Sequence, residues 1–111
     1  MIQEERKIEI YFEDATLAER GIKASNLRDH ILENFSDVKI DIKKEDPTTQ
    51  DLGTILVLIL GAPAVVAIAR GIADYLRRDR GKITITKDGT VVAEGLSGDD
   101  AARITEAMSK K

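Results

Sequence analysis

The sequence predicts an α+β fold in which helices cover mainly one face of a single sheet. Residues 7–12, 38–43 and 82–94 contain short runs that alternate apolar and polar side chains, as half-buried strands do. Residues 25–35 and 101–108 instead carry apolar side chains at helical spacing. We therefore expect a two-layer domain with a mixed sheet of about four strands, in the order β-α-β-αα-β-β-α.

The first expected strand covers residues 7–12 (KIEIYF), whose three apolar side chains fall on one side. Residues 13–24 are ambiguous. Asp14 could cap a short helix that ends at Gly21, or the whole stretch could be a loop. The pattern leaves both alternatives open.

A helix is expected over residues 25–35, with Ser25 or Asn26 as its N-cap. A strand with one polar face follows over residues 38–43, and Pro47 prevents its simple continuation. Because strand–helix–strand crossovers are right-handed, we expect the first and second strands to be parallel with that hand.

Residues 82–87 (KITITK) and 90–94 (TVVAE) predict a β-hairpin, because Asp88-Gly89 between two β-rich runs favours a type I′ turn. Ser97 and Asp100 then stand at the spacing of a capping box, although Asp replaces the preferred Glu or Gln.

The final helix presents an inner face formed by Ala101, Ile104, Thr105 and Met108. We expect residues 108–111 to fray, since chain ends are often poorly ordered.

The central stretch LGTILVLILGAPAVVAIARG carries no charged side chain from residue 52 to residue 69. Gly61 suits the position after a helix and Pro63 suits the first turn of a second one, so the stretch is interpreted as two helices. The second helix is expected to be amphipathic and to end at Gly81, and its apolar stripe consists of Val65, Ile68, Ala69, Ile72 and Leu76. Periodicity leaves open a buried strand over residues 55–60, which are apolar on every side.

Three roles are considered for this stretch. It can fill a soluble core, which is the favoured interpretation. It can insert into a membrane as a helical hairpin over residues 52–69, although the run is short of the about 20 residues that a span requires. Part of it can also form an interface with a partner protein or a second copy, and the residues considered for that role are Leu56, Val57, Leu58 and Leu60.

No arrangement typical of catalysis is recognised in the sequence. His30 is the single histidine, there is no cysteine, and phosphate-binding or nucleophile motifs do not occur. Asp99 and Asp100 follow Ser97 at a helix start, where carboxylates complement the helix dipole. We therefore expect neither an enzyme nor a metal or other cofactor.

A basic run follows the second central helix and contains Arg77, Arg78, Arg80 and Lys82. It could bind an anion or an acidic partner, and it lacks the aromatic residues that stack on nucleobases. The alternative is that these cations simply stabilise the C-terminal end of a helix.

Composition limits the class of protein further. The 111 residues are most simply one domain, and a net charge of −3 argues against a nucleic-acid-binding protein. The absence of cysteine and of an apolar signal-peptide core leads us to expect a cytoplasmic protein.

Three motifs give the chain a resemblance to the bacterial effector-associated constant component family. They are Asp51-Leu52-Gly53, Gly61-Ala62-Pro63 and the Tyr75-Leu76-Arg77 ending of the second central helix. The resemblance implies that the aliphatic run is a helix. It also implies a non-enzymatic adaptor of bacterial conflict systems, with protein partners such as effector peptidases or signalling NTPases.

Overall fold

The computed structural model describes residues 5–13, 15–36, 38–44, 54–87 and 90–109. These residues form five strands and three α-helices around one hydrophobic core. The elements are β1 (Glu5–Phe12), α1 (Leu17–Asn34), β2 (Val38–Lys44), β3 (Thr54–Gly61), the short 3-10 helix η2 (Ala62–Ala64), α2 (Val65–Asp79), β4 (Ile83–Lys87), β5 (Thr90–Leu96) and α3 (Ala101–Ser109).

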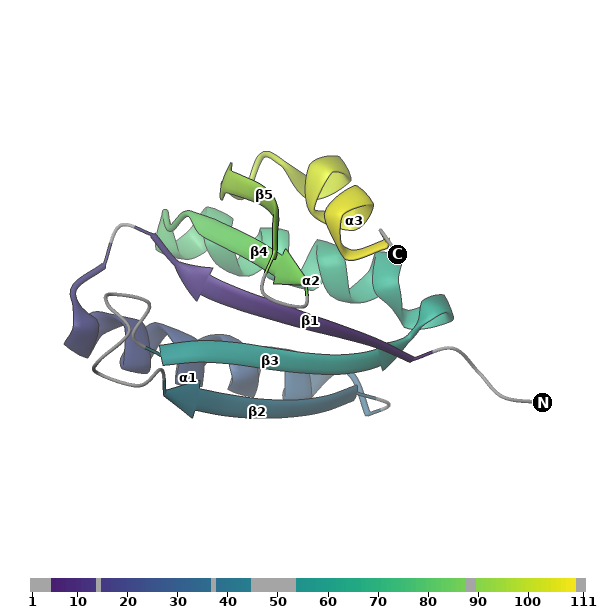
Figure 1. Ribbon diagram of the computed structural model, residues 1–111, viewed down its shortest axis with the longest axis horizontal. Helices are drawn as coiled ribbons and strands as arrows, with labels where there is room; N and C mark the ends of the chain where they lie inside the picture. The colour runs from purple at the N-terminus through teal and green to yellow at the C-terminus, as the bar shows by residue number, and fades with distance from the viewer. Residues whose placement is uncertain (1–4, 14, 37, 45–53, 88–89, 110–111) are drawn as a thin grey trace.

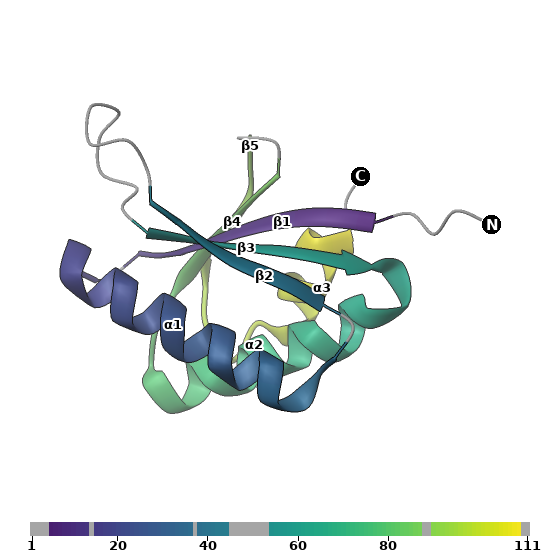
Figure 2. The same ribbon diagram turned by 90° about the horizontal axis from the view of Figure 1, so that it is seen from below.

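The strands form one sheet in the order β2-β3-β1-β4-β5, and every neighbouring pair is antiparallel. The three helices lie on one side of this sheet, with α1 beneath β2 and β3 and with α2 beneath β1 and β4 (Figures 1 and 2). The α+β class and the placement of the helices are therefore confirmed. We call the opposite side of the sheet its open face.

The sheet differs from the expected one in two respects. It has five strands, and it is antiparallel where a mixed sheet was expected. Both β1 and β2 run antiparallel to β3, so they share one direction, as the strand–helix–strand pattern predicts. They do not pair with each other, however, because β3 lies between them.

The interpretation of residues 54–60 as a helix was wrong, because these residues form strand β3. The strand lies between β2 and β1 and pairs with both along most of its length. Both edges of a strand in that position are paired. One of its faces packs in the core, and the other lies among the side chains of the neighbouring strands. The local pattern therefore shows neither helical nor alternating periodicity.

The two faces of β3 are buried in different ways. Leu56, Leu58 and Leu60 point to the helices and are at most 1% exposed. Ile55 and Val57 lie on the open face, yet they are only 3% and 7% exposed. The pairing places Val57 between Glu9 and Asp41, while Ile59 lies between Lys7 and Lys39 and Ile55 lies opposite Lys43. Long polar side chains in such rows can cover an aliphatic stripe with their methylene groups.

Helix α1 begins well before residue 25, which resolves the ambiguous stretch in favour of a helix. Its N-cap is Thr16, whose hydroxyl accepts the Glu19 N–H at 3.2 Å while the Glu19 carboxylate accepts the Thr16 N–H at 3.2 Å. This capping box replaces the predicted caps at Ser25 or Asn26. Gly21 lies inside the helix, and Asp14 lies outside the described residues.

Helix α2 has the predicted amphipathic pattern, with one face buried against the sheet. Its C-cap is Arg80, in the left-handed conformation at φ 55°, rather than Gly81.

The predicted hairpin strands are confirmed as β4 and β5, with Lys87 opposite Thr90. The turn predicted at Asp88-Gly89 lies outside the described residues.

The predicted Ser97–Asp100 pairing occurs at the start of α3. The Asp100 carboxylate accepts the Ser97 N–H at 2.8 Å and the Ser97 hydroxyl at 3.1 Å. The helix then buries Ile104, Ala107 and Met108 in the common core. Helix α3 extends through Ser109, so it includes residues 108 and 109 of the segment that was expected to fray; residues 110 and 111 lie outside the described part of the chain.

The helical hairpin considered for membrane insertion over residues 52–69 is not present, because residues 54–61 are a strand and α2 begins at Val65. Among the described residues, no helix combines the length and the apolar character needed to cross a bilayer.

The central role of β3 predicts a large cost for truncating its inward side chains. We expect Leu58→Ala to lower the free energy of unfolding by about 2–5 kcal/mol, because Leu58 is fully buried and the truncation leaves a cavity. Val66→Ala is the matched control, since Val66 is 48% exposed on α2 and alanine favours helix. Urea denaturation measures both; equal losses would contradict the central position of β3.

The Asp100 cap predicts a pH-dependent contribution to stability. The Ser97 backbone N–H, more than any other group, holds the pKa of Asp100 below its ordinary 3.8. A carboxyl whose pKa is lowered by folding stabilises the folded state above the unfolded pKa and loses this effect as the pH falls through the folded value. The stability difference between wild type and Asp100→Asn should therefore be present at about pH 7 and should shrink as the pH falls below the ordinary pKa of 3.8.

Thermal unfolding across this pH range measures the difference. Asp99→Asn changes the same charge one residue away, without touching the Ser97 contact, and serves as the control. A difference between wild type and Asp100→Asn that persists unchanged into acid would contradict the assignment.

Candidate functional site

Three exposed arginines gather at the C-terminal end of α2. Arg77 and Arg78 belong to the last turn of the helix, and Arg80 is its C-cap. All three face solvent because the buried stripe of the helix ends with Leu76. Cations at this end also complement the helix dipole. We call this group the arginine cluster.

One side of the arginine cluster lies against the loop between β5 and α3. The Arg77 guanidinium donates to the Gly98 carbonyl at 3.0 Å and also lies 3.4 Å from the Asp74 carboxylate. Arg77, Arg80 and Lys82 line a shallow hollow of about 240 Å³ together with Ser97, Gly98 and Asp99. The hollow therefore combines three cations with one carboxylate and with backbone and hydroxyl groups.

Close packing at Gly98 holds the loop against α2. A Cβ atom on Gly98 would lie 2.5 Å from the Arg77 backbone nitrogen and 2.6 Å from its Cα. Because these are backbone atoms, they could make room only if the helix or the loop moved. A glycine at this position lets the loop approach the helix closely enough for the Arg77–Gly98 hydrogen bond.

The other side of the arginine cluster faces α1. Lys23 of α1 forms an ion pair with Asp79 of α2. The rings of His30 and Tyr75 lie 6.0 Å apart across the two helices, and Tyr75 has a side-chain hydrogen bond with Asn26. An open hollow of about 370 Å³ lies here, lined by Asn26, Asp29, His30, Glu33, Tyr75, Arg78 and Asp79.

Tyr75 connects this hollow to the core. Its ring meets Phe12 edge to face, with centroids 6.4 Å apart. Burial, and to a lesser extent the negative charge of Asp79, raises the pKa of Tyr75 above its ordinary 10.0, while the hydrogen bond with Asn26 acts in the opposite direction. The phenol is therefore neutral at physiological pH and can donate a hydrogen bond at the rim of the hollow.

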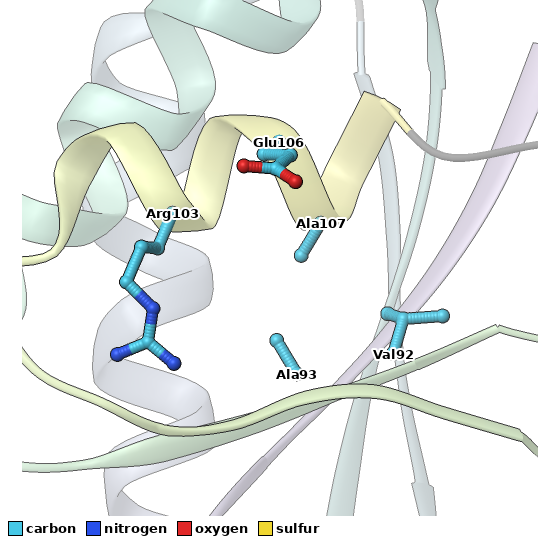
Figure 3. A pocket seen from close by; sticks show the side chains of 5 residues that line it. All are labelled: Val92, Ala93, Arg103, Glu106 and Ala107. Atoms are coloured by element: carbon cyan, nitrogen blue, oxygen red, sulfur yellow. The ribbon is translucent and has the colours of Figure 1, made fainter.

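A third hollow, of about 210 Å³, lies between β5 and α3. Figure 3 shows Arg103 and Glu106 extending from α3, with the small side chains of Ala93 and Ala107 facing each other between the two elements. Arg103 also lies 3.5 Å from the Asp100 carboxylate. The described residues that line this third hollow provide one cation, Arg103, and one anion, Glu106, and no nucleophilic side chain.

The charged side chains of the arginine cluster are exposed to solvent. Among the described residues, no group of three or more His, Cys, Asp or Glu side chains is placed to hold a metal ion.

The structure separates the residues that the sequence suggested for an interface. Leu56, Leu58 and Leu60 lie in the core and are at most 1% exposed, and Val57 lies on the open face. The three arginines remain together on the surface. Sequence reasoning did not assign Tyr75, Asn26 or Gly98 to this region, because their proximity depends on the packing of α1 and of the β5–α3 loop against α2.

In comparisons with known proteins, no family model, curated protein or solved structure matches this chain. The site is therefore interpreted from its own geometry. The helix that the family resemblance implied over the aliphatic run is strand β3.

The close approach at Gly98 predicts that a single methyl group disturbs this end of the molecule. Gly98→Ala should lower the free energy of unfolding by about 1–3 kcal/mol, as overpacking against fixed atoms does. The matched control is Gly71→Ala, within α2, where the new Cβ would meet only the movable Phe35 ring at 3.2 Å. Chemical denaturation compares the two; an unchanged stability for Gly98→Ala would contradict the close packing.

Proposed function

We propose that this protein is a non-catalytic adaptor that binds a partner protein through the arginine cluster. The observation that carries the proposal is the exposure of Arg77, Arg78 and Arg80 together, with Arg77 and Arg80 lining one open hollow and Arg78 lining another. The partner surface that fits them is acidic.

The chemistry of arginine supports this role. A guanidinium offers several donors in a planar fork that matches a carboxylate, and it is hydrated more weakly than an ammonium group. Arginine and tyrosine are also enriched among the residues that dominate binding energy in protein interfaces. Tyr75 lies beside Arg78 at the rim of the larger hollow, so both residue types are present in one region.

Arg77 and the elements on either side of the cluster are held in place before any partner arrives. The Arg77–Gly98 hydrogen bond fixes the β5–α3 loop on one side, and the Lys23–Asp79 ion pair fixes α1 on the other. A surface that is already ordered loses less conformational entropy on binding. The arginine cluster therefore suits a specific partner.

The partner class that we propose follows the family resemblance. Effector peptidases and NTP-dependent regulators of bacterial conflict systems are the proposed partners, and the chain would link one to the other without catalysis. The membrane-active alternative has less support, because the segment proposed to insert contains the central strand of the sheet.

Charge reversal of the arginine cluster tests the proposal. Arg78→Glu with Arg80→Glu removes two cations while keeping Arg77 and its bond to Gly98. The matched control is Lys7→Glu with Lys43→Glu, which makes the same change in charge on the open face. Each variant is used for affinity capture from cells that express the chain natively, followed by binding measurements with the purified partner.

We expect a partner with an acidic surface to bind wild type and the control variant. The arginine variant should bind it at least about tenfold more weakly, and the wild-type affinity should fall as salt increases. Equal retention of the partner by all three proteins would show that the arginine cluster is not the binding site.

A further inference from the structure

Strand β2 forms a regular edge of the sheet. It pairs with β3 on one side, from Val38 opposite Leu60 to Lys44 opposite Thr54, without a shift in register. Within the described part of the chain, no strand pairs with its other side. A straight edge of this kind presents backbone N–H and C=O groups that another strand can bind.

The opposite edge of the sheet is less suited to pairing. The register between β4 and β5 shifts twice, between Ile83 and Ile85 and again between Ile85 and Thr86. Near its end, β5 contains Gly95 at φ 67°, and the Gly95 N–H donates to the Glu13 carboxylate. Bulges and diverted hydrogen bonds of this type protect an edge from a further strand. Strand β2 has no such irregularity.

The side chains of β2 divide between the two faces of the sheet. Val38, Ile40 and Ile42 lie in register with the inward leucines of β3, so they face the helices. Ile40 and Ile42 are only partly buried, at the rim of the core. Lys39 and Asp41 point to the open face and are exposed.

We propose that β2 pairs antiparallel with β2 of a second copy of this chain, with the two Ile40 residues opposite each other. The sequence VKIDI is complementary to itself in this register. Each Val38 faces the partner's Ile42, and each Lys39 faces the partner's Asp41. The helix side of the new ladder is entirely aliphatic, and its open side carries two pairs of opposite charge, both of which stabilise cross-strand pairing. The result is a continuous sheet across a two-fold axis.

Other antiparallel registers are less favourable. A ladder centred on Asp41 would place the two Asp41 carboxylates opposite each other and would set Lys39 against Lys43. A ladder centred on Ile42 would pair Asp41 with Lys43 but would oppose Ile40 with Lys44, a charged residue. Of these three registers, only the one centred on Ile40 pairs aliphatic side chains on the helix side and opposite charges on the open side.

Helix α1 places an apolar side chain on the same side of the molecule. Lys23 and His30 mark the flank of α1 that faces α2. At 100° per residue, Leu32 lies on the opposite flank, and it is 49% exposed. Since α1 lies beneath β2 and α2 lies beyond it (Figure 2), that flank faces the free edge of the sheet. Leu32 therefore adds an exposed apolar side chain on the flank of α1 that lies on the side of the free β2 edge.

Charge exchange within the strand tests both the dimer and its register. Lys39→Asp would set two pairs of aspartates against each other, and Asp41→Lys would do the same with lysines. The exchange variant K39D/D41K restores opposite charges in every pair. So does an equimolar mixture of the two single variants, which are complementary to each other but not to themselves.

Sedimentation velocity and light scattering over a range of protein concentrations give the dissociation constant of each protein. We expect wild type and K39D/D41K to dimerise with similar constants and each single variant to dimerise about tenfold or more weakly. Mixing the single variants should restore the dimer. Circular dichroism confirms that each variant is folded, which is expected because both positions are exposed.

Three results would overturn the inference. Wild type could remain monomeric at every concentration, in which case β2 does not pair with itself. Lys39→Asp could strengthen the dimer, which is the result for a ladder centred on Asp41. Alternatively, K39D/D41K could fail to restore the dimer, which is the result for a ladder centred on Ile42, where position 41 faces Lys43.

Discussion

The fold depends on the enclosure of β3 between two antiparallel neighbours. Its backbone groups are paired on both edges by β2 and β1, and its leucines belong to the common core, where β3 packs against α1. An unbroken aliphatic segment is stable in water only where both of its faces are covered. Strand β3 meets that condition because it lies between β2 and β1, and β2 is then the edge strand of the sheet.

The packing of the helices on the sheet determines which polar side chains meet at the surface. Because α1 and α2 are packed side by side on the sheet, the outward ends of Tyr75, Asn26 and His30 meet above the core. The arginine cluster lies at the end of α2, where the helix contacts both α1 and the β5–α3 loop. A rigid core thus supports a polar surface whose components come from three separate parts of the chain.

The proposed dimer and the proposed partner site use different sides of the molecule. The β2 edge lies on the far side of α1 from α2, so pairing through β2 leaves the end of α2 exposed in each copy (Figure 2). A dimer would therefore present two arginine clusters. Two linked sites bind a multivalent partner more tightly than either site does alone, through the high effective concentration of the second site.

The sequence by itself determined the α+β class, the strands over residues 7–12 and 38–43, the hairpin strands, the amphipathic helix α2 and the cap before α3. Each of these depends on local patterns, namely alternation, helical spacing and hydrogen bonds between residues close in the sequence. The start of α1 could also have been predicted, because Thr16 and Glu19 stand at capping-box spacing.

Only the tertiary structure decided the secondary structure of residues 54–61 and the composition of the site around the end of α2. An aliphatic run without periodicity is compatible with a helix or with a strand, and the neighbours on either side select between them. The approach of Gly98 to Arg77 and of His30 to Tyr75 joins residues that are distant in the sequence. Such contacts follow from packing, which no local pattern encodes.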